Sequence, residues 1–206
     1  MKDKSEDYIR LERAYNTILS LEQKLESMEQ MQVREPVAVI GVACKFPGMI
    51  DSPLDYYRML SEGKHVIEDI PADRWNFDEY DLELKNRIYC QKGGFLSNPY
   101  QFDPLHFNIS PIEAEFMDPQ QRIFLESCWK AFEDAGYTPD RLNQVRCGVY
   151  AGVVSNDYYT YLDSIPHTPE PYEVIGNYNS MLSARIAYFL NLKGPAVTLD
   201  TACSSS

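Results

Sequence analysis

Residues 196–206 read AVTLDTACSSS, an apolar run that leads through a short polar segment to Cys203 and three serines. The run Ala196–Leu199 is typical of a short buried strand, and small serines directly after a strand favour a helix start. This order places Cys203 at a helix N-terminus, where unpaired backbone N–H groups and the helix dipole stabilise a thiolate relative to a thiol. Because the thiolate is the nucleophilic form, the pattern indicates covalent catalysis by Cys203.

The same residues have a second interpretation, in which Cys203 is a packed thiol without a chemical role. Cysteine is among the most buried residue types, and serine-rich chain ends are commonly disordered. Motifs built on one cysteine also occur by chance in unrelated sequences. The choice therefore depends on the rest of the chain.

Six further motifs precede the Cys203 segment in a fixed order. They are PVAVIGVACKFPG (36–48), DIPADRW (69–75), GGF (93–95), FDP to ISP (102–111), MDPQQR (117–122) and EDAGY (133–137). Together with DTACSSS (200–206), they resemble the N-terminal half of the β-ketoacyl synthase (ketosynthase) domain of modular polyketide synthases. The resemblance covers residues 36–206 and implies that Cys203 is the catalytic residue that carries the growing acyl chain.

The resemblance also implies a fold and a reaction. The fold is α/β, a thiolase-type layered α-β-α-β-α fold, of which residues 35–206 hold the first half. The reaction is the decarboxylative Claisen condensation of an acyl chain on Cys203 with a malonyl-type extender on an acyl carrier protein. The domain itself binds no cofactor, since its substrates arrive on the phosphopantetheine of carrier proteins, and it acts as a homodimer.

Two alternatives to an elongating enzyme stay open. The family's two decarboxylating histidines lie downstream of Ser206, so residues 1–206 alone are expected to be inactive in condensation. The whole protein is then either an elongating synthase or a domain that holds and transfers acyl chains without extending them. The chain by itself could also act as a docking or scaffold fragment. The sequence does not indicate the acyl substrate, the extender or the product.

Residues 1–34 differ in kind from the rest. Apolar residues alternate three and four positions apart and fill the a and d positions of a heptad repeat: Leu11, Ala14, Ile18, Leu21, Leu25 and Met28. Lys24 then occupies a g position and Glu29 the following e position, an attractive pair between parallel chains. A single amphipathic helix that packs on its own domain is the alternative. We favour a parallel coiled coil, which in such synthases resembles a docking element for the preceding subunit.

Composition excludes several other classes of protein. The net charge of −12 argues against nucleic acid, whose phosphates would be repelled. No apolar run approaches the roughly 18 residues that a membrane span requires, and the charged N-terminus is unlike a signal peptide. We therefore expect a cytoplasmic protein without membrane or nucleic-acid partners. The five cysteines are dispersed and odd in number, which indicates reduced thiols rather than disulfides or a metal site.

The remaining residues predict alternating strands and helices. Strands are expected at 37–42, 145–154 and 196–199, the first two as buried apolar runs. Helices are expected to begin at Pro53, at the Ser110–Glu113 capping box and at Asp118, with Gly136 ending the third. A further helix is expected over 177–190. The long segment 64–108 shows no clean period, and its scattered aromatics favour a packed excursion. The histidines His65, His106 and His167 are widely spaced and are interpreted as surface or loop residues. Residues 117–122 are interpreted as helix punctuation and packing.

Overall fold

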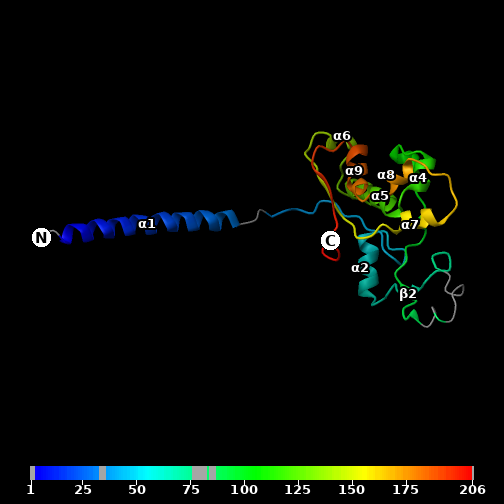
Figure 1. Cartoon of the computed structure of the whole chain (residues 1–206), viewed down its shortest axis with the longest axis horizontal. Coiled ribbons are helices and arrows are strands. Elements are labelled where there is room, and N and C mark those ends of the chain that lie inside the picture. The colour runs from blue at the N-terminus through cyan, green and yellow to red at the C-terminus, as the bar shows by residue number, and fades with distance from the viewer. Residues whose placement is uncertain (1–2, 33–35, 76–82, 84–86, 206) are drawn as a thin grey trace. The chain divides into compact units, whose positions relative to one another are not determined.

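The computed structural model describes residues 3–32, 36–75, 83 and 87–205. The chain divides into two compact units, Met1–Val39 and Ile40–Ser206, which are drawn together in Figure 1. The first unit holds helix α1 (Asp3–Gln32), so the predicted helix over residues 1–34 is confirmed. The side chains of Leu11, Ile18, Leu21 and Leu25, which form the predicted seam, are each more than half exposed.

The second unit contains one short 3₁₀ helix and most of the helices of the described chain. Their bounds are α2 (Pro53–Ser61), η2 (Leu105–Phe107), α4 (Pro111–Phe116), α5 (Pro119–Asp134), α6 (Pro139–Leu142), α7 (Asp157–Ser164), α8 (Tyr172–Asn177) and α9 (Ser180–Phe189). Figure 1 shows α4, α5, α8 and α9 grouped together, and neighbouring members of this group contact one another. Helices therefore make up most of the regular secondary structure that is described in this unit.

The predicted helix starts are confirmed by their caps. The side chains of Ser52, Ser110 and Asp118 each accept a hydrogen bond from a backbone N–H of the first helical turn. Proline follows each cap, at the position where its missing N–H costs nothing. Only one half of the predicted capping box forms. Ser110 Oγ accepts the N–H of Glu113, but the Glu113 carboxylate binds Arg185. Gly136 ends α5 with a positive φ of 70°, as predicted.

Two strands form the parallel sheet that leads to Cys203. Strand β3 (Val149–Gly152) pairs with β4 (Ala196–Leu199), with Val149 opposite Ala196 and Gly152 opposite Leu199. Helix α9, which precedes β4, contacts both strands. The strand predicted at 145–154 is shorter than expected. Val149 and Ala151 are buried whereas Tyr150 between them is exposed, so this strand is buried on one face rather than two.

The predicted buried strand at residues 37–42 is wrong. No strand forms over residues 36–45, and Val37 and Val39 are more than 80% exposed. A parallel strand needs a neighbour for its ladder and helices over both faces. Among the described residues, no strand pairs with this segment. Its backbone is held instead at Val42, whose N–H donates to Asp134 Oδ2 at 2.8 Å.

The helix predicted over 177–190 is also corrected, because it consists of α8 and α9 with a break at Tyr178 and Asn179. The side chain of Asn177 explains the break. Its Nδ2 donates to the carbonyls of Phe116 and Glu173, at 3.0 and 2.7 Å, at the end of α8. Asparagine side chains compete with the helix backbone in this way.

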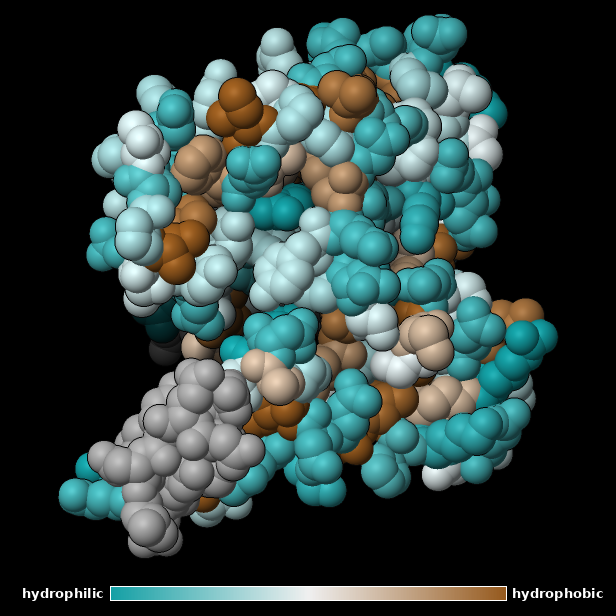
Figure 2. Space-filling model, turned by 90° about the vertical axis from the view of Figure 1, so that its right-hand side faces the viewer, coloured by the Kyte–Doolittle hydropathy of each residue, from teal (hydrophilic) through white to brown (hydrophobic). Residues whose placement is uncertain are grey.

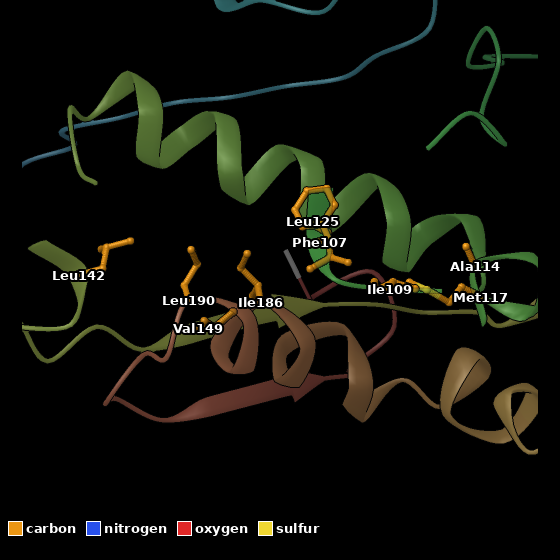
Figure 3. Close-up of a cluster of buried hydrophobic side chains, with 9 residues drawn as sticks. All are labelled: Phe107, Ile109, Ala114, Met117, Leu125, Leu142, Val149, Ile186 and Leu190. Atoms are coloured by element: carbon orange, nitrogen blue, oxygen red, sulfur yellow. The ribbon is translucent and has the colours of Figure 1, made fainter. Parts of the chain in front are cut away.

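The hydrophobic core lies between α5 on one side and α9 with strands β3 and β4 on the other. Figure 3 shows Leu125 of α5 pointing toward Ile186 of α9, and both side chains are almost fully buried. The cluster also contains Phe107, Ile109, Ala114, Met117, Leu142, Val149 and Leu190. This packing fixes α9 and therefore β4, the strand that leads directly to Cys203.

Over its described residues, the segment predicted as a packed excursion, 64–108, contains little regular structure. A short antiparallel ladder joins β1 (Glu68–Asp69) to β2 (Lys92–Gly93). Aromatic packing is present, with the rings of Phe102 and Phe107 stacked at 5.3 Å and Arg74 lying over Tyr100. Residues 76–82 and 84–86 lie outside the described residues.

Apolar side chains also remain on the surface of the second unit. Leu54, Leu105, Tyr150 and Tyr188 are more than half exposed. Hydrophobic patches are visible among hydrophilic residues on the face drawn in Figure 2. Over the described residues, no helix combines the length and hydropathy needed to cross a membrane.

Candidate active site

Cys203 lies in a tight turn directly after β4. The backbone N–H of Thr201 donates to Ser205 Oγ at 2.7 Å, and that of Ala202 donates to Asp200 Oδ1 at 3.1 Å. The N–H of Ser205 donates to the carbonyl of Ala202 at 3.0 Å, which closes the turn around Cys203. The Cys203 side chain is exposed, so a reagent or substrate in solution can reach the thiol.

The expected helix at Cys203 is not formed over the described residues, where residues 201–205 make turns instead. The turn has a different feature at this position. Ala202 has a φ of 54°, in the left-handed region that an alanine rarely adopts. Backbone strain of this kind is concentrated at functional sites.

The strand before the turn is anchored on α9. The hydroxyls of Ser183 and Thr198 lie 2.9 Å apart and share a hydrogen bond, and Ser183 is buried. Among the residues that the structure describes, none accepts a hydrogen bond from the backbone N–H of Cys203. An unpaired N–H beside a nucleophile is a potential donor to a developing oxyanion.

The other four cysteines have different surroundings. Burial, and next the neighbouring Cys147, raises the pKa of Cys128 to about 12. Burial also raises the pKa values of Cys44 and Cys147 above their ordinary value. Cys90 is exposed like Cys203, but its Sγ contacts the carbonyl of Lys92 at 3.4 Å. Two cysteines, Cys90 and Cys203, are therefore exposed to solvent. The other three, Cys44, Cys128 and Cys147, are partly buried.

We expect native alkylation to follow this division. With iodoacetamide at about pH 8, Cys203 and Cys90 should react first and Cys128 last, because the thiolate is the reactive form. Peptide mapping by mass spectrometry over time measures the order. A urea-denatured sample, in which all five cysteines are accessible, is the control. Alkylation of native Cys128 as fast as that of Cys90 would contradict the structure.

Two histidines have packed or hydrogen-bonded surroundings away from the Cys203 turn. The ring of His106 packs edge-on against Phe107 and Trp129, at centroid distances of 4.8 and 4.7 Å. The ring of His167 lies between two acceptors, with Nδ1 2.9 Å from the Ile165 carbonyl and Nε2 3.0 Å from Glu173 Oε1. His65 is exposed. All three histidines are exposed, and His106 lies in η2, which agrees with their interpretation as surface or loop residues.

The contacts of His167 predict a pH-dependent loop between α7 and α8. Hydrogen bonding to Ile165, followed in size by the effects of Glu173 and Asp163, raises the pKa of His167. Because folding raises the pKa of His167, protonated His167 stabilises the folded loop fully at pH values below its unfolded pKa of about 6.5. This stabilisation is lost as the pH rises through the folded pKa of His167. Hydrogen exchange of residues 165–173 should therefore be slower in the wild type than in His167→Gln at about pH 6, with the difference vanishing at high pH.

The exposed His65 supplies the control for that measurement, because His65→Gln should leave exchange in the α7–α8 loop unchanged at both pH values. A His167→Gln effect of equal size at low and high pH would show that the charge of His167 has no part in holding the loop.

Residues 117–122 form a buried polar junction, as their interpretation as helix punctuation and packing predicts. Asp118 caps α5, and burial raises the pKa of its carboxyl despite hydrogen bonds from Gln120. Arg122 is buried and donates from Nε to the Met117 carbonyl at 3.0 Å and from Nη1 to the Tyr100 carbonyl at 3.2 Å. The burial of Arg122 was not predictable from its residue type, since arginine is usually exposed.

A second arginine, which is partly buried, joins three helices. Arg185 of α9 donates to Gln121 Oε1 of α5 at 2.8 Å and forms an ion pair with Glu113 of α4 at 2.6 Å. The side chains of Arg185 and Glu113 are 9% and 17% exposed, so the pair is little screened by water. These contacts support the fold and do not touch Cys203.

Replacing Arg122 should destabilise the domain. Arg122→Met keeps an unbranched apolar stem but leaves the buried Met117 carbonyl without its side-chain donors, at a cost of about 3 kcal/mol in unfolding free energy. Hydrogen exchange of α5 amides in increasing urea measures the loss. Arg58→Met on α2 is the matched control, since Arg58 is exposed and its ion pair with Asp55, at 3.4 Å, lies on the surface. Equal effects of the two variants would refute the structural role of Arg122.

A cavity of about 550 Å³ lies between α5, β3 and α9. Its lining includes the side chains predicted to share one face of α5, namely Phe124, Cys128, Ala131, Phe132 and Ala135. Ile40 and Gly41 border the same cavity, whereas Cys203 is not among its lining residues. The predicted amphipathic face of α5 is therefore confirmed, and the cavity is separate from the Cys203 turn.

Comparison with known proteins assigns the family. The sequence model of the β-ketoacyl synthase N-terminal domain matches residues 34–206. The chain belongs to the β-ketoacyl synthase family. The ketosynthase from module 6 of the bacillaene synthase of Bacillus subtilis 168 is 45% identical, with a TM-score of 0.71 over 82% of this chain. An oxazolomycin ketosynthase domain of Streptomyces albus JA3453 is 34% identical, with a TM-score of 0.68 over 82% of the chain.

Curated relatives of this ketosynthase chain are polyketide synthases. Polyketide synthase PksL of Bacillus subtilis is 44% identical over 90% of the chain, and polyketide synthase GfsE of Streptomyces halstedii is 43% identical over 100%. The chain spans 4% and 5% of the length of these two relatives, and 27% and 29% of the two solved ketosynthase chains. These matches confirm the expected resemblance to ketosynthase domains. They also confirm the thiolase-type α/β fold, of which this chain holds the N-terminal half.

Proposed function

We propose that Cys203 is the acyl-carrying nucleophile of a β-ketoacyl synthase in a modular polyketide synthase. One observation carries the proposal. The only cysteine of the DTACSSS segment lies exposed in a strained turn at the carboxyl end of a parallel strand, within a chain of the β-ketoacyl synthase family. Catalytic side chains of α/β proteins are commonly found at this end of the strands. The other four cysteines lie outside this segment.

The proposed reaction has two steps. The Cys203 thiolate attacks the thioester carbonyl of an acyl chain on a phosphopantetheine arm, and the carrier thiol leaves as the acyl-enzyme forms. A malonyl-type extender on a carrier protein then loses carbon dioxide, and the resulting carbanion attacks the acyl-Cys203 carbonyl. The Cys203 thiolate leaves, and the β-ketoacyl chain remains on the carrier, two carbons longer.

The residues of this chain have limited but defined roles in that scheme. Cys203 supplies the nucleophile and the leaving group, and its backbone N–H is a candidate donor to the tetrahedral oxyanion. None of His65, His106 and His167 is assigned to decarboxylation, in keeping with their exposed positions and with the contacts of His106 and His167. The proposal that residues 1–206 alone do not condense stays a prediction.

The test supplies the complete synthase with an acyl thioester and a malonyl-loaded carrier protein. An elongating enzyme releases carbon dioxide and forms a β-ketoacyl carrier. A domain that only holds or transfers acyl chains acquires the acyl group without either product. Absence of both the acyl-enzyme and the product would contradict the proposed function.

Residues 1–34 are proposed to pair in parallel and to dock the preceding synthase subunit. The helix exposes the seam residues Leu11, Ile18, Leu21 and Leu25, and uncovered apolar side chains at a/d spacing favour a coiled coil. The similarity to the Streptomyces halstedii polyketide synthase spans 100% of this chain and so includes the helix. A helix of this length is marginal alone in water, so pairing would depend on a dimeric ketosynthase behind it or on partner helices.

A further inference from the structure

The turn that holds Cys203 rests on the last residue of the neighbouring strand. Gly152 ends β3 and is paired with Leu199 of β4. A Cβ on Gly152 would overlap the carbonyl oxygen of Ser205 and would lie 2.9 Å from its carbonyl carbon and 3.1 Å from its Cβ. Real Cβ atoms essentially never approach a neighbour below 3.0 Å. The absence of a side chain at Gly152 therefore creates the space that Ser205 fills.

Ser205 in turn closes the loop around the nucleophile. Its Oγ accepts the N–H of Thr201 at 2.7 Å, and its own N–H donates to the carbonyl of Ala202 at 3.0 Å. Cys203 lies inside the loop that these two bonds close. Any displacement of Ser205 is consequently transmitted to the backbone that carries the thiol.

The strained residue before Cys203 makes this support necessary. An alanine in the left-handed region, such as Ala202 at φ 54°, is sterically disfavoured, because its Cβ comes too close to the following carbonyl oxygen. Such a conformation persists only where surrounding contacts hold it. The hydrogen bond that Ser205 accepts from Thr201, the one that it donates to Ala202, and its close approach to Gly152 are such contacts.

We propose that Gly152 and Ser205 are positioning residues for Cys203: Gly152 supplies the space in which Ser205 is held, and Ser205 fixes the turn that presents the thiol. This inference rests on the proposed function of Cys203 as the nucleophile. It assigns a role in the acylation step to β3, a strand that carries no nucleophile of its own.

The first test is Gly152→Ala in the complete synthase, assayed by single-turnover acylation of Cys203 with an acyl thioester. The maximal acylation rate should fall by about tenfold to a hundredfold, because small misplacements of a reacting group have effects of this size. The KM for the thioester should change little, since the added methyl lies under the turn and not in contact with substrate. This split separates positioning from general damage to the fold.

Gly148→Ala is the matched control, because it makes the same change just before the other end of β3. Its added Cβ would lie 3.2 Å from Pro195 and 3.1 Å from the ring of Tyr150, and not against the Cys203 turn. This variant should acylate at close to the wild-type rate. Equal rates for Gly152→Ala and Gly148→Ala would overturn the role of Gly152.

Ser205 provides a second test that needs no change in β3 and decides the matter if Gly152→Ala does not fold. Ser205→Ala removes the acceptor for Thr201 and should slow acylation, whereas Ser205→Thr keeps a hydroxyl and should restore most of the rate. Wild-type rates in Ser205→Ala would overturn the inference. If the acyl group in wild-type protein were found on a residue other than Cys203, the proposed function would fail instead, so the two failures are distinguishable.

Discussion

Cys203→Ala in the complete synthase should abolish both the acyl-enzyme and the β-ketoacyl product, with a loss on the order of a thousandfold or more in rate. The physical reason is that no covalent intermediate can form without the thiolate, so the two-step route is lost. Intact-protein mass spectrometry after incubation with an acyl thioester measures the acyl-enzyme, and product analysis measures condensation.

Cys90→Ala is the control for this prediction, because Cys90 is the other exposed cysteine among the described residues. It should acylate and condense at the wild-type rate. Stoichiometric acylation that persists in Cys203→Ala would remove Cys203 from the mechanism.

Ile18→Lys combined with Leu21→Glu should abolish acyl transfer from the upstream carrier while leaving condensation of a small diffusible thioester intact. These two residues lie at the centre of the predicted seam, at a and d, where a charge would be desolvated between paired helices. Comparing carrier-bound and diffusible substrates in the complete synthase separates delivery from chemistry.

The chain offers a matched control on the opposite side of the same helix. Asn16→Lys with Gln23→Glu introduces the same charges at f positions of the heptad, which a coiled coil leaves in water. This variant should transfer normally from the upstream carrier. Equal loss of both activities in the Ile18→Lys and Leu21→Glu variant would show that α1 supports the fold of the domain rather than docking.

Local signals in the sequence predicted the helices well. Ser52, Ser110 and Asp118, each followed by proline, form the caps that their residue types predict. The apolar face of α5 was likewise predictable, because its 3.6-residue period does not depend on the rest of the chain. The catalytic candidate Cys203 was reached by pattern and resemblance together.

Features that depend on distant residues were not predictable in this way. The apolar run at 37–42 satisfies the pattern of a buried strand, yet a strand also requires a neighbour that supplies hydrogen bonds. The burial of Arg122 depends on carbonyls of Met117 and Tyr100, which only the fold brings together. The missing side chain of Gly152 leaves room for Ser205 only because the fold brings β3 and the Cys203 turn side by side.

The most direct test of the account is the location of the acyl group in the wild-type protein. The complete synthase is incubated with an acyl thioester, digested, and mapped by mass spectrometry. The account predicts the acyl mass on the peptide that contains residues 200–206, at Cys203, and on no peptide that contains Cys44, Cys90, Cys128 or Cys147. An acyl group on any of those four cysteines with Cys203 unmodified would contradict it.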